Sequence, residues 1–365
     1  MKQVVVVLML LFAVTVVRGQ SGDLDEPWSI VEQCILQEGT PPADWSFDGM
    51  ILTVNNGQLI GYSQNNNGIQ SSVIQETGIP AYGHLSPDGL WYAIVKGSSE
   101  ADGLVTVVTT FEIQVYSTIE DRHYVVPWEN TYHIMRRNFG HQLYWLDNSH
   151  LLYSKDMNGG EHWFIIDPFS AEITTWDQPF TPTHFAFELT PDAQKGIASA
   201  WSEPYWNILS TEEPIETQTR THFQALWHPS SEHFATTTWP KVSEEPEKLI
   251  LVDLNGEIIH SLYRASKIPP GYFDARGMLW SPDGRYLAFA DDHLYIADTL
   301  TQQVYDTCFS PVINLAWAPR THQLALFEGG DNTHSLQVID LDRAVSYIVD
   351  QRTMFLIGWR ADDEE

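Results

Sequence analysis

One tight turn between two apolar segments recurs along this chain. Its clearest copy runs from Leu279 to Phe289 and reads Leu-Trp-Ser-Pro-Asp-Gly-Arg-Tyr-Leu-Ala-Phe. A second copy reads Leu-Ser-Pro-Asp-Gly at 85–89, and a third reads Trp-Ser-Phe-Asp-Gly at 45–49. Pro and Gly favour the backbone angles of such turns, so the flanking segments are predicted to be antiparallel strands. The residues assigned to these structural turns are Asp48, Gly49, Pro87, Asp88, Gly89, Pro282, Asp283 and Gly284.

The turn belongs to a longer repeat with a Trp or Leu just before it. Repeats of about 40 to 45 residues are typical of propeller blades, each of which must bury its apolar face against the next. We therefore expect the anchor Trp side chains to pack between blades rather than to bind a ligand. The anchors are Trp45, Leu85, Trp145, Leu189, Trp227, Trp280, Trp317 and Trp359.

Four short strands are predicted in each unit, which makes the chain an all-β protein. The number of complete units favours seven four-stranded antiparallel blades, with six or eight as alternatives if one degenerate unit is misread. The segment from Met354 to Trp359 has an anchor but no hairpin after it. We expect this segment to complete the blade that begins near Trp45, because closing the ring in this way removes exposed sheet edges.

The run from Trp280 to Phe289 resembles the TolB-type, WD40-like propeller repeat, and the resemblance extends over residues 40–361. It implies a β-propeller and, for many members of the group, a location outside the cytoplasm and a role as a platform for protein interactions. The motif is structural, so the resemblance implies no particular reaction.

The first residues are typical of an export signal. Lys2 precedes an apolar run from Val4 to Val17 that is short for a membrane span, and Gly19 precedes the expected cleavage site. We expect a signal peptide at 1–19, a lead-in segment at 20–39, the propeller at 40–361 and an acidic tail at 362–365. A membrane anchor is the alternative. The mature protein is then predicted to be extracytoplasmic, being secreted, periplasmic or at the cell surface, with no membrane insertion.

The net negative charge of the chain argues against two classes of partner. The chain has 19 Lys and Arg against 48 Asp and Glu, a formal net charge of −29. Such a surface repels the phosphates of nucleic acids and anionic lipids, so neither is an expected partner. We expect a monomer.

Cysteine is scarce, with only Cys34 and Cys308. Two cysteines exclude a disulfide-rich framework and a Cys-rich metal site, although export permits one disulfide. Both residues lie about ten positions before a repeat anchor, which predicts equivalent outer strands of different blades. Whether they approach within the roughly 7 Å between Cα atoms that a bridge requires is left open by the sequence.

Sequence signatures of catalysis and metal binding are absent. There is no Gly-x-Ser-x-Gly elbow, no His-Glu-x-x-His helix and no Gly-rich phosphate loop. Two polar sets lack the spacing of a known metal site, so we predict no metal and no cofactor, and we assign no catalytic residue. These sets are the histidines at 133, 141, 150 and 162, and the possible calcium ligands Asp156, Asn158 and Glu161.

The favoured function is a non-catalytic propeller that presents loops on one face to a protein or peptide partner. The alternative is a carbohydrate-binding or glycoside-hydrolysing propeller with its site at the channel mouth. Several carboxylates flanked by exposed Trp in the channel would favour the alternative, because glycoside hydrolysis uses paired acids. The candidate ligand-binding residues are Trp128, Trp201, Tyr205 and Trp206.

Overall fold

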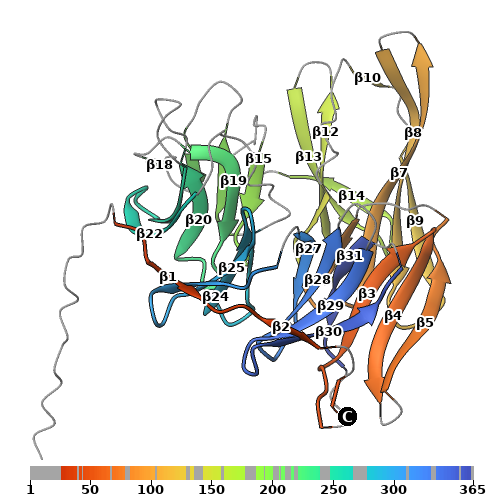
Figure 1. Ribbon diagram of the computed structural model, residues 1–365. Coiled ribbons are helices and arrows are strands. Elements are labelled where there is room, and N and C mark those ends of the chain that lie inside the picture. Colours follow the sequence, from red (N-terminus) through yellow and green to blue (C-terminus); the bar gives the residue numbers. More distant parts are fainter. Residues whose placement is uncertain are drawn as a thin grey trace, which may run out of the picture.

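The computed structural model shows an all-β molecule (Figure 1). It describes residues 26–38, 41–42, 44–65, 68–78, 83–102, 105–128, 132–134, 143–157, 160–176, 186–192, 194–199, 205, 207–209, 215–217, 221–238, 247–265, 278–309, 312–329, 334–352 and 355–362. Within these ranges we find no helix of the length and hydrophobicity needed to cross a bilayer. The expected signal peptide lies outside them.

The described strands form seven sheets, each an antiparallel blade of a propeller. Blade 1 contains β31 (Phe355–Arg360), β3 (Met50–Asn55), β4 (Gln58–Asn65) and β5 (Gly68–Glu76). Blade 2 contains β6 (Gly83–Leu85), β7 (Trp91–Asp102), β8 (Val105–Ser117) and β9 (His123–Trp128), with β10 (Tyr132–Ile134) also paired to β8. Blade 3 contains β11 (Leu143–Trp145), β12 (Leu151–Met157), β13 (Gly160–Asp167) and β14 (Glu172–Thr175).

The remaining blades follow in chain order. Blade 4 contains β15 (Ala186–Leu189), β16 (Gly196–Ser199), β17 (Asn207–Leu209) and β18 (Ile215–Glu216). Blade 5 contains β19 (Thr221–Trp227), β20 (His233–Thr238), β21 (Lys248–Asp253) and β22 (Ile258–Arg264). Blade 6 contains β23 (Met278–Trp280), β24 (Tyr286–Ala290), β25 (Leu294–Asp298) and β26 (Gln303–Asp306). Blade 7 contains β27 (Val312–Trp317), β28 (Gln323–Gly329), β29 (His334–Asp340) and β30 (Val345–Asp350). The predicted seven-bladed propeller is confirmed.

The C-terminal strand closes the ring, as predicted. β31 pairs with β3 from Met50↔Arg360 to Val54↔Phe355, so the inner strand of blade 1 comes from the opposite end of the chain. The Trp359 indole N–H donates to the backbone carbonyl of Asp48 at 2.6 Å. Trp45 differs from the other anchors because it lies outside the strands and packs against Tyr347 of blade 7.

A second connection, made by the N-terminal segment, runs along the outside of consecutive blades. We call residues 28–38 the strap: β1 (Ser29–Glu32) pairs in parallel with β26, and β2 (Leu36–Glu38) pairs in parallel with β30. The Trp28 amide also donates to the Ser261 carbonyl of blade 5 at 3.2 Å. In Figure 1 the strap crosses the outer rim next to blades 6 and 7. The expected lead-in segment thus contributes strands that cover the edges of two blades.

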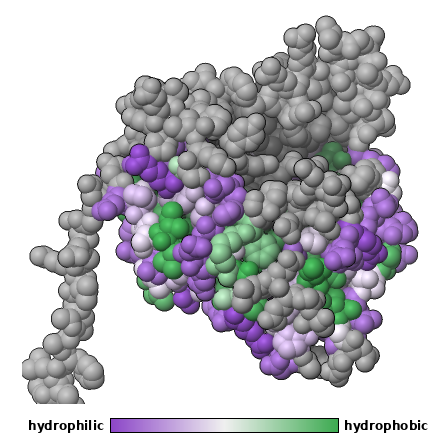
Figure 2. Space-filling model, viewed as in Figure 1, coloured by the Kyte–Doolittle hydropathy of each residue, from purple (hydrophilic) through white to green (hydrophobic). Residues whose placement is uncertain are grey.

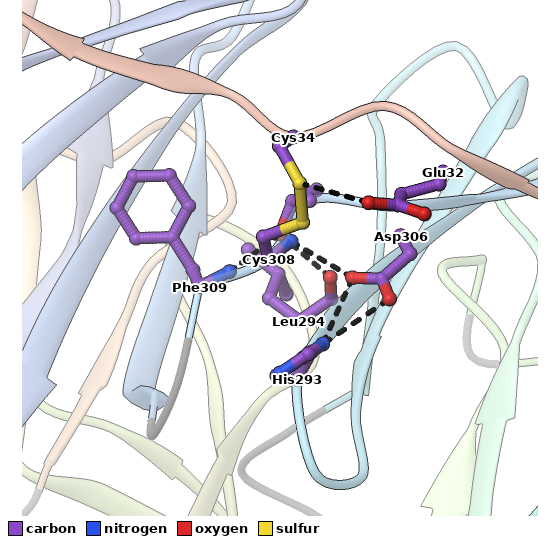
Figure 3. Close-up of a disulfide and its surroundings, with 8 residues drawn as sticks. Glu32, Cys34, His293, Leu294, Asp306, Cys308 and Phe309 are labelled. Carbon is purple, nitrogen blue, oxygen red and sulfur yellow. Dashed lines mark hydrogen bonds and ion pairs between the residues drawn. A yellow bond between two sulfur atoms is a disulfide. The ribbon is translucent and has the colours of Figure 1, made fainter.

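The two cysteines form a disulfide between the strap and blade 6 (Figure 3). Cys34 lies between β1 and β2, and Cys308 follows β26, with their Cα atoms 4.9 Å apart. The expectation that both residues occupy equivalent outer strands was wrong. Because the strap runs beside β26, it brings a residue that is remote in sequence next to the end of that strand.

The turns after the inner strands share one hydrogen-bond network. In blade 6 the Ser281 hydroxyl donates to Asp283 at 2.6 Å and accepts the Tyr286 amide at 2.9 Å. Blades 2 and 4 repeat this network; in blade 4 Thr190 takes the place of Ser, and Asp192 is the carboxylate. A hydroxyl and a carboxylate two residues apart therefore maintain the turn even where Gly is absent. Gly49, Gly89 and Gly284 have φ between 74° and 82°, which glycine adopts readily.

The anchor Trp side chains tie each blade to the one before it. Four anchor indole N–H groups each donate a hydrogen bond to the preceding blade. The acceptor is the backbone carbonyl of the residue immediately before that blade's own anchor, so a polar group at the blade interface is satisfied. Trp227, Trp280 and Trp317 are at most 6% exposed. The bonds are Trp145 to His84 at 2.9 Å, Trp227 to Glu188 at 3.2 Å, Trp280 to Leu226 at 3.3 Å and Trp317 to Leu279 at 3.0 Å.

Candidate functional site

The strand order gives the propeller two different faces. The face that carries the turns after the inner strands, including Pro87 and Pro282, is called the turn face. The opposite face, where the second strand of a blade turns into the third, is called the hairpin face. Successive strands are antiparallel within each blade, so these two connections fall at opposite ends of the strands.

Two of the predicted binding residues, Trp128 and Tyr205, lie at the hairpin-face ends of described strands. Trp128 is the last residue of β9, and its side chain lies outside the described residues. Tyr205 is half-buried and precedes β17, whereas Trp201 and Trp206 lie outside the described residues. The strand order thus places Trp128 and Tyr205 on one face, in blades 2 and 4, which are separated by blade 3. The role of all four residues in ligand binding stays a prediction.

Two hairpins extend above the hairpin face. β7 and β8 pair from Trp91↔Ser117 to Asp102↔Val105, while β9 pairs with β8 only as far as Phe111↔Trp128. The β12–β13 hairpin of the next blade pairs as far as Met157↔Gly160, beyond the reach of β11 and β14. Figure 1 shows both hairpins rising beyond the other described strands. The extended β7–β8 and β12–β13 hairpins are called the wall.

A cavity of about 400 Å³ lies at the turn-face end of the central channel. Inner strands of five consecutive blades contribute to it, so it lies on the propeller axis. Exposed turn residues, including Pro87 and Pro191, form its rim and open it to solvent. Its lining residues are His84, Leu85, Pro87, Tyr144, Trp145, Leu146, Glu188, Leu189, Thr190, Pro191, Leu226, Trp227, Pro229, Leu279 and Trp280.

Glu188 is the acidic residue of this cavity. Its main-chain carbonyl accepts the Trp227 indole N–H, while in the described part of the chain no hydrogen-bond or ion-pair partner reaches its carboxyl group. Burial among apolar walls disfavours the charged form and raises the pKa of Glu188 to about 8. Desolvation by the surrounding walls lowers the pKa of His84, although its side chain keeps access to solvent; it packs against Tyr144 with ring centroids 5.9 Å apart.

Other polar groups around the cavity are already engaged. The three Trp side chains donate to backbone carbonyls of neighbouring blades. The Thr190 hydroxyl donates to Asp192 at 2.5 Å and accepts the Lys195 amide at 3.0 Å. Ligand recognition here would therefore depend on the Glu188 carboxyl and the His84 imidazole, surrounded by Leu, Pro and aromatic side chains.

Glycosidases of the two-carboxylate type need paired acids about 5 to 10 Å apart, and calcium takes six to eight oxygen ligands. Among the described residues that line the cavity, Glu188 is the sole carboxylate.

A second cavity, of about 200 Å³, lies between the strap and blades 6 and 7. Arg285 and Asp298 line it, but their side chains pair with each other at 3.0 Å. Because these opposite charges satisfy one another, this cavity resembles a packing gap beneath the strap more than a ligand site.

Sequence reasoning missed Glu188. A signal was present, because Glu188 immediately precedes the anchor Leu189, and the same position holds His84, Tyr144, Leu226 and Leu279 in other blades. Aligning the repeats at the anchors would have shown a carboxylate at a position that faces the axis.

Comparisons with known proteins extend only to the fold. No family model and no curated protein matches the chain. TolB from Acinetobacter baumannii is 13% identical over 88% of this chain and 68% of its own, with a TM-score of 0.46. Two proteins described as candidate 6-phosphogluconolactonases give TM-scores of 0.50. The one from Bacteroides uniformis is 12% identical over 86% of this chain and 98% of its own. The one from Bacteroides fragilis is 14% identical over 87% and 98%. At these identities the likeness shows a shared β-propeller architecture.

Proposed function

We propose that the mature chain is an exported, non-catalytic β-propeller that binds a protein partner on its hairpin face. The observation that carries the proposal is the wall of blades 2 and 3. Stable protein interfaces bury about 800 Å² on each partner, and a raised sheet beside a propeller face gives a partner a second surface to contact. Two of the aromatic candidates, Trp128 at the end of β9 and Tyr205 before β17, are at this same face.

Export is supported by two independent features. The N-terminal residues have the pattern of a signal peptide. The strap is joined to blade 6 by the Cys34–Cys308 disulfide, a bond that persists mainly in oxidising compartments.

The visible side of the outer rim has no single large apolar area among its described residues. Figure 2 shows separate small apolar areas among hydrophilic residues on the visible side. The exposed large apolar residues that the structure describes are spread over five blades and the strap, as with Ile30, Val73 and Ile173. Scattered single residues of this kind are ordinary on a soluble surface.

The proposal is tested by shortening the wall. In the test variant, residues 98–110 are replaced by Asn-Gly, which joins the paired positions Gly97 and Phe111. In the control variant, residues 330–333 of the β28–β29 hairpin, on the same face but in blade 7, are replaced in the same way. Each protein, from Gln20 onward, is used as bait for the secreted and surface proteins of its own source cells.

The expected result is one partner that binds the wild type and the control with the same Kd and the test variant at least about tenfold more weakly. The proposal fails if the test variant binds that partner as tightly as the control does. A glycan array run in parallel examines the alternative, since saturable glycan binding without a protein partner would favour a carbohydrate-binding propeller.

A further inference from the structure

We infer that the turn-face cavity is a second binding site, which takes a primary ammonium group on an apolar stem with Glu188 as its counter-ion. This site lies at the opposite end of the channel from the wall. The inference therefore does not depend on the proposed protein partner.

The first support is the carboxyl group itself. Glu188 faces an open cavity, and no described side chain pairs with it. A half-buried acid among apolar walls and without a partner is costly to ionise, whereas a cation that enters the cavity supplies the missing charge and a hydrogen-bond donor. The overall charge of −29 also concentrates cations around the molecule.

The second support is the composition of the walls. Leu189, Leu226 and Leu279 provide apolar surface, and Tyr144 provides an aromatic ring. Such walls suit an alkyl or aryl stem, and an aromatic face also attracts a nearby ammonium group. About 400 Å³ is within the range of small-molecule sites.

Other ligand classes fit less well. Among the described lining residues there is one carboxylate, which is too few for a hydrated divalent metal ion, and the donors that a sugar would need are engaged by the backbone. An anion would meet Glu188 without a cationic lining residue to hold it. A neutral alcohol is the remaining competitor, because it could accept a hydrogen bond from the protonated acid.

The ionisation state of Glu188 distinguishes the ammonium ion from the neutral alcohol. An ammonium ion requires the carboxylate, so its affinity should rise as pH increases through 8, until the amine itself loses its proton near about 10. A neutral alcohol should bind more weakly over the same range. His84 and Tyr144 are the other titratable lining residues, and only a protonated His84, at acidic pH, would repel the cation.

The probes are 2-phenylethylammonium and its neutral analogue 2-phenylethanol, titrated calorimetrically into the mature wild-type protein at pH 6.0 and 8.5. Two further titrations use Nα-acetyl-lysine methylamide and its Nε-acetylated form. These titrations distinguish a free amine from the lysine side chain of a protein as the source of the ammonium group.

Glu188→Gln is the test variant and Glu216→Gln, on the exposed outer strand of the same blade, is the control. We expect the ammonium probe to bind the wild type at least about tenfold more tightly at pH 8.5 than at pH 6.0. Glu188→Gln should abolish this pH dependence and weaken binding at pH 8.5 by a similar factor, and Glu216→Gln should do neither.

The inference is overturned if Glu188→Gln binds the amine as the wild type does, or if 2-phenylethanol binds equally well at pH 8.5. Absence of binding by both ammonium probes at millimolar concentration overturns it too. Failure of the wall experiment would leave these results unaffected, because that experiment alters only the hairpin face.

Discussion

The indole N–H of Trp227 donates to the backbone carbonyl of Glu188 at 3.2 Å, across the interface between blades 5 and 4. The anchor of one blade thus positions the residue whose carboxyl group faces the axis in the blade before it. The same offset links Trp280 to Leu226 and Trp317 to Leu279. A repeated packing contact therefore determines where channel-facing residues lie, while their chemistry varies from blade to blade.

The indole bond should contribute measurably to stability. Trp317→Phe keeps an aromatic ring but leaves the Leu279 carbonyl without its donor, which should lower the free energy of unfolding by about 1–3 kcal/mol. Urea denaturation measures the difference. Trp28→Phe is the control, because Trp28 is half-buried in the strap and its indole makes no interblade hydrogen bond in the described structure. Equal losses in both variants would show that ring volume alone matters.

A side chain at Gly49 should clash with the backbone of the closing strand β31. A Cβ atom there would lie 2.0 Å from the Arg360 carbonyl oxygen, and φ is +82°. Gly68 also has a positive φ, +99°, but open space around it. Gly49→Ala should therefore lower the free energy of unfolding by at least about 2 kcal/mol more than Gly68→Ala does. Similar urea midpoints for the two variants would contradict the observed contact between Gly49 and the closing strand.

The fold was predictable because its information is local and repeated. Ser281, Asp283 and Gly284 encode a turn within a few residues, and Trp280 encodes the packing position beside it. The closing strand was also visible, as an anchor at Trp359 without a following hairpin. These signals depend on short-range chemistry, which a single sequence contains.

The strap and the cavity depend on contacts that no local pattern encodes. Cys34 and Cys308 are separated by 274 positions, and only the parallel pairing of β1 with β26 brings them together. In the sequence, Glu188 looks like any charged residue of a strand. Only the assembled propeller places the inner strands of five blades around it. Its surroundings are a product of the assembled ring and could not be derived from one unit.

The disulfide should hold the strap on the rim. Reduction, or the double substitution Cys34→Ser and Cys308→Ser, should lower the free energy of unfolding by about 2–5 kcal/mol, because the oxidised bridge restricts the unfolded chain. Amide hydrogen exchange in β1 and β2 should also accelerate, since the edges of β26 and β30 lose their covalently fixed neighbour. Dithiothreitol should leave the urea midpoint of the double variant unchanged. The same midpoint for oxidised and reduced wild type would refute this role.

Glu188 should make the protein less stable at alkaline pH. Its pKa is about 8 in the folded state and 4.5 for a glutamate carboxyl in water, so between these pH values the folded state keeps a proton that the unfolded state releases. Stability from this group is therefore complete below about pH 4.5 and is lost as pH rises to about 8. Glu188→Gln removes this dependence, whereas His84, with its lowered pKa, contributes the opposite slope below about 6.5 in both proteins. Urea unfolding from pH 4.5 to 8.5 should show equal stability at the acidic end and a variant about 1–4 kcal/mol more stable at the alkaline end. Parallel stability curves would mean that Glu188 ionises in the native channel as it does in water.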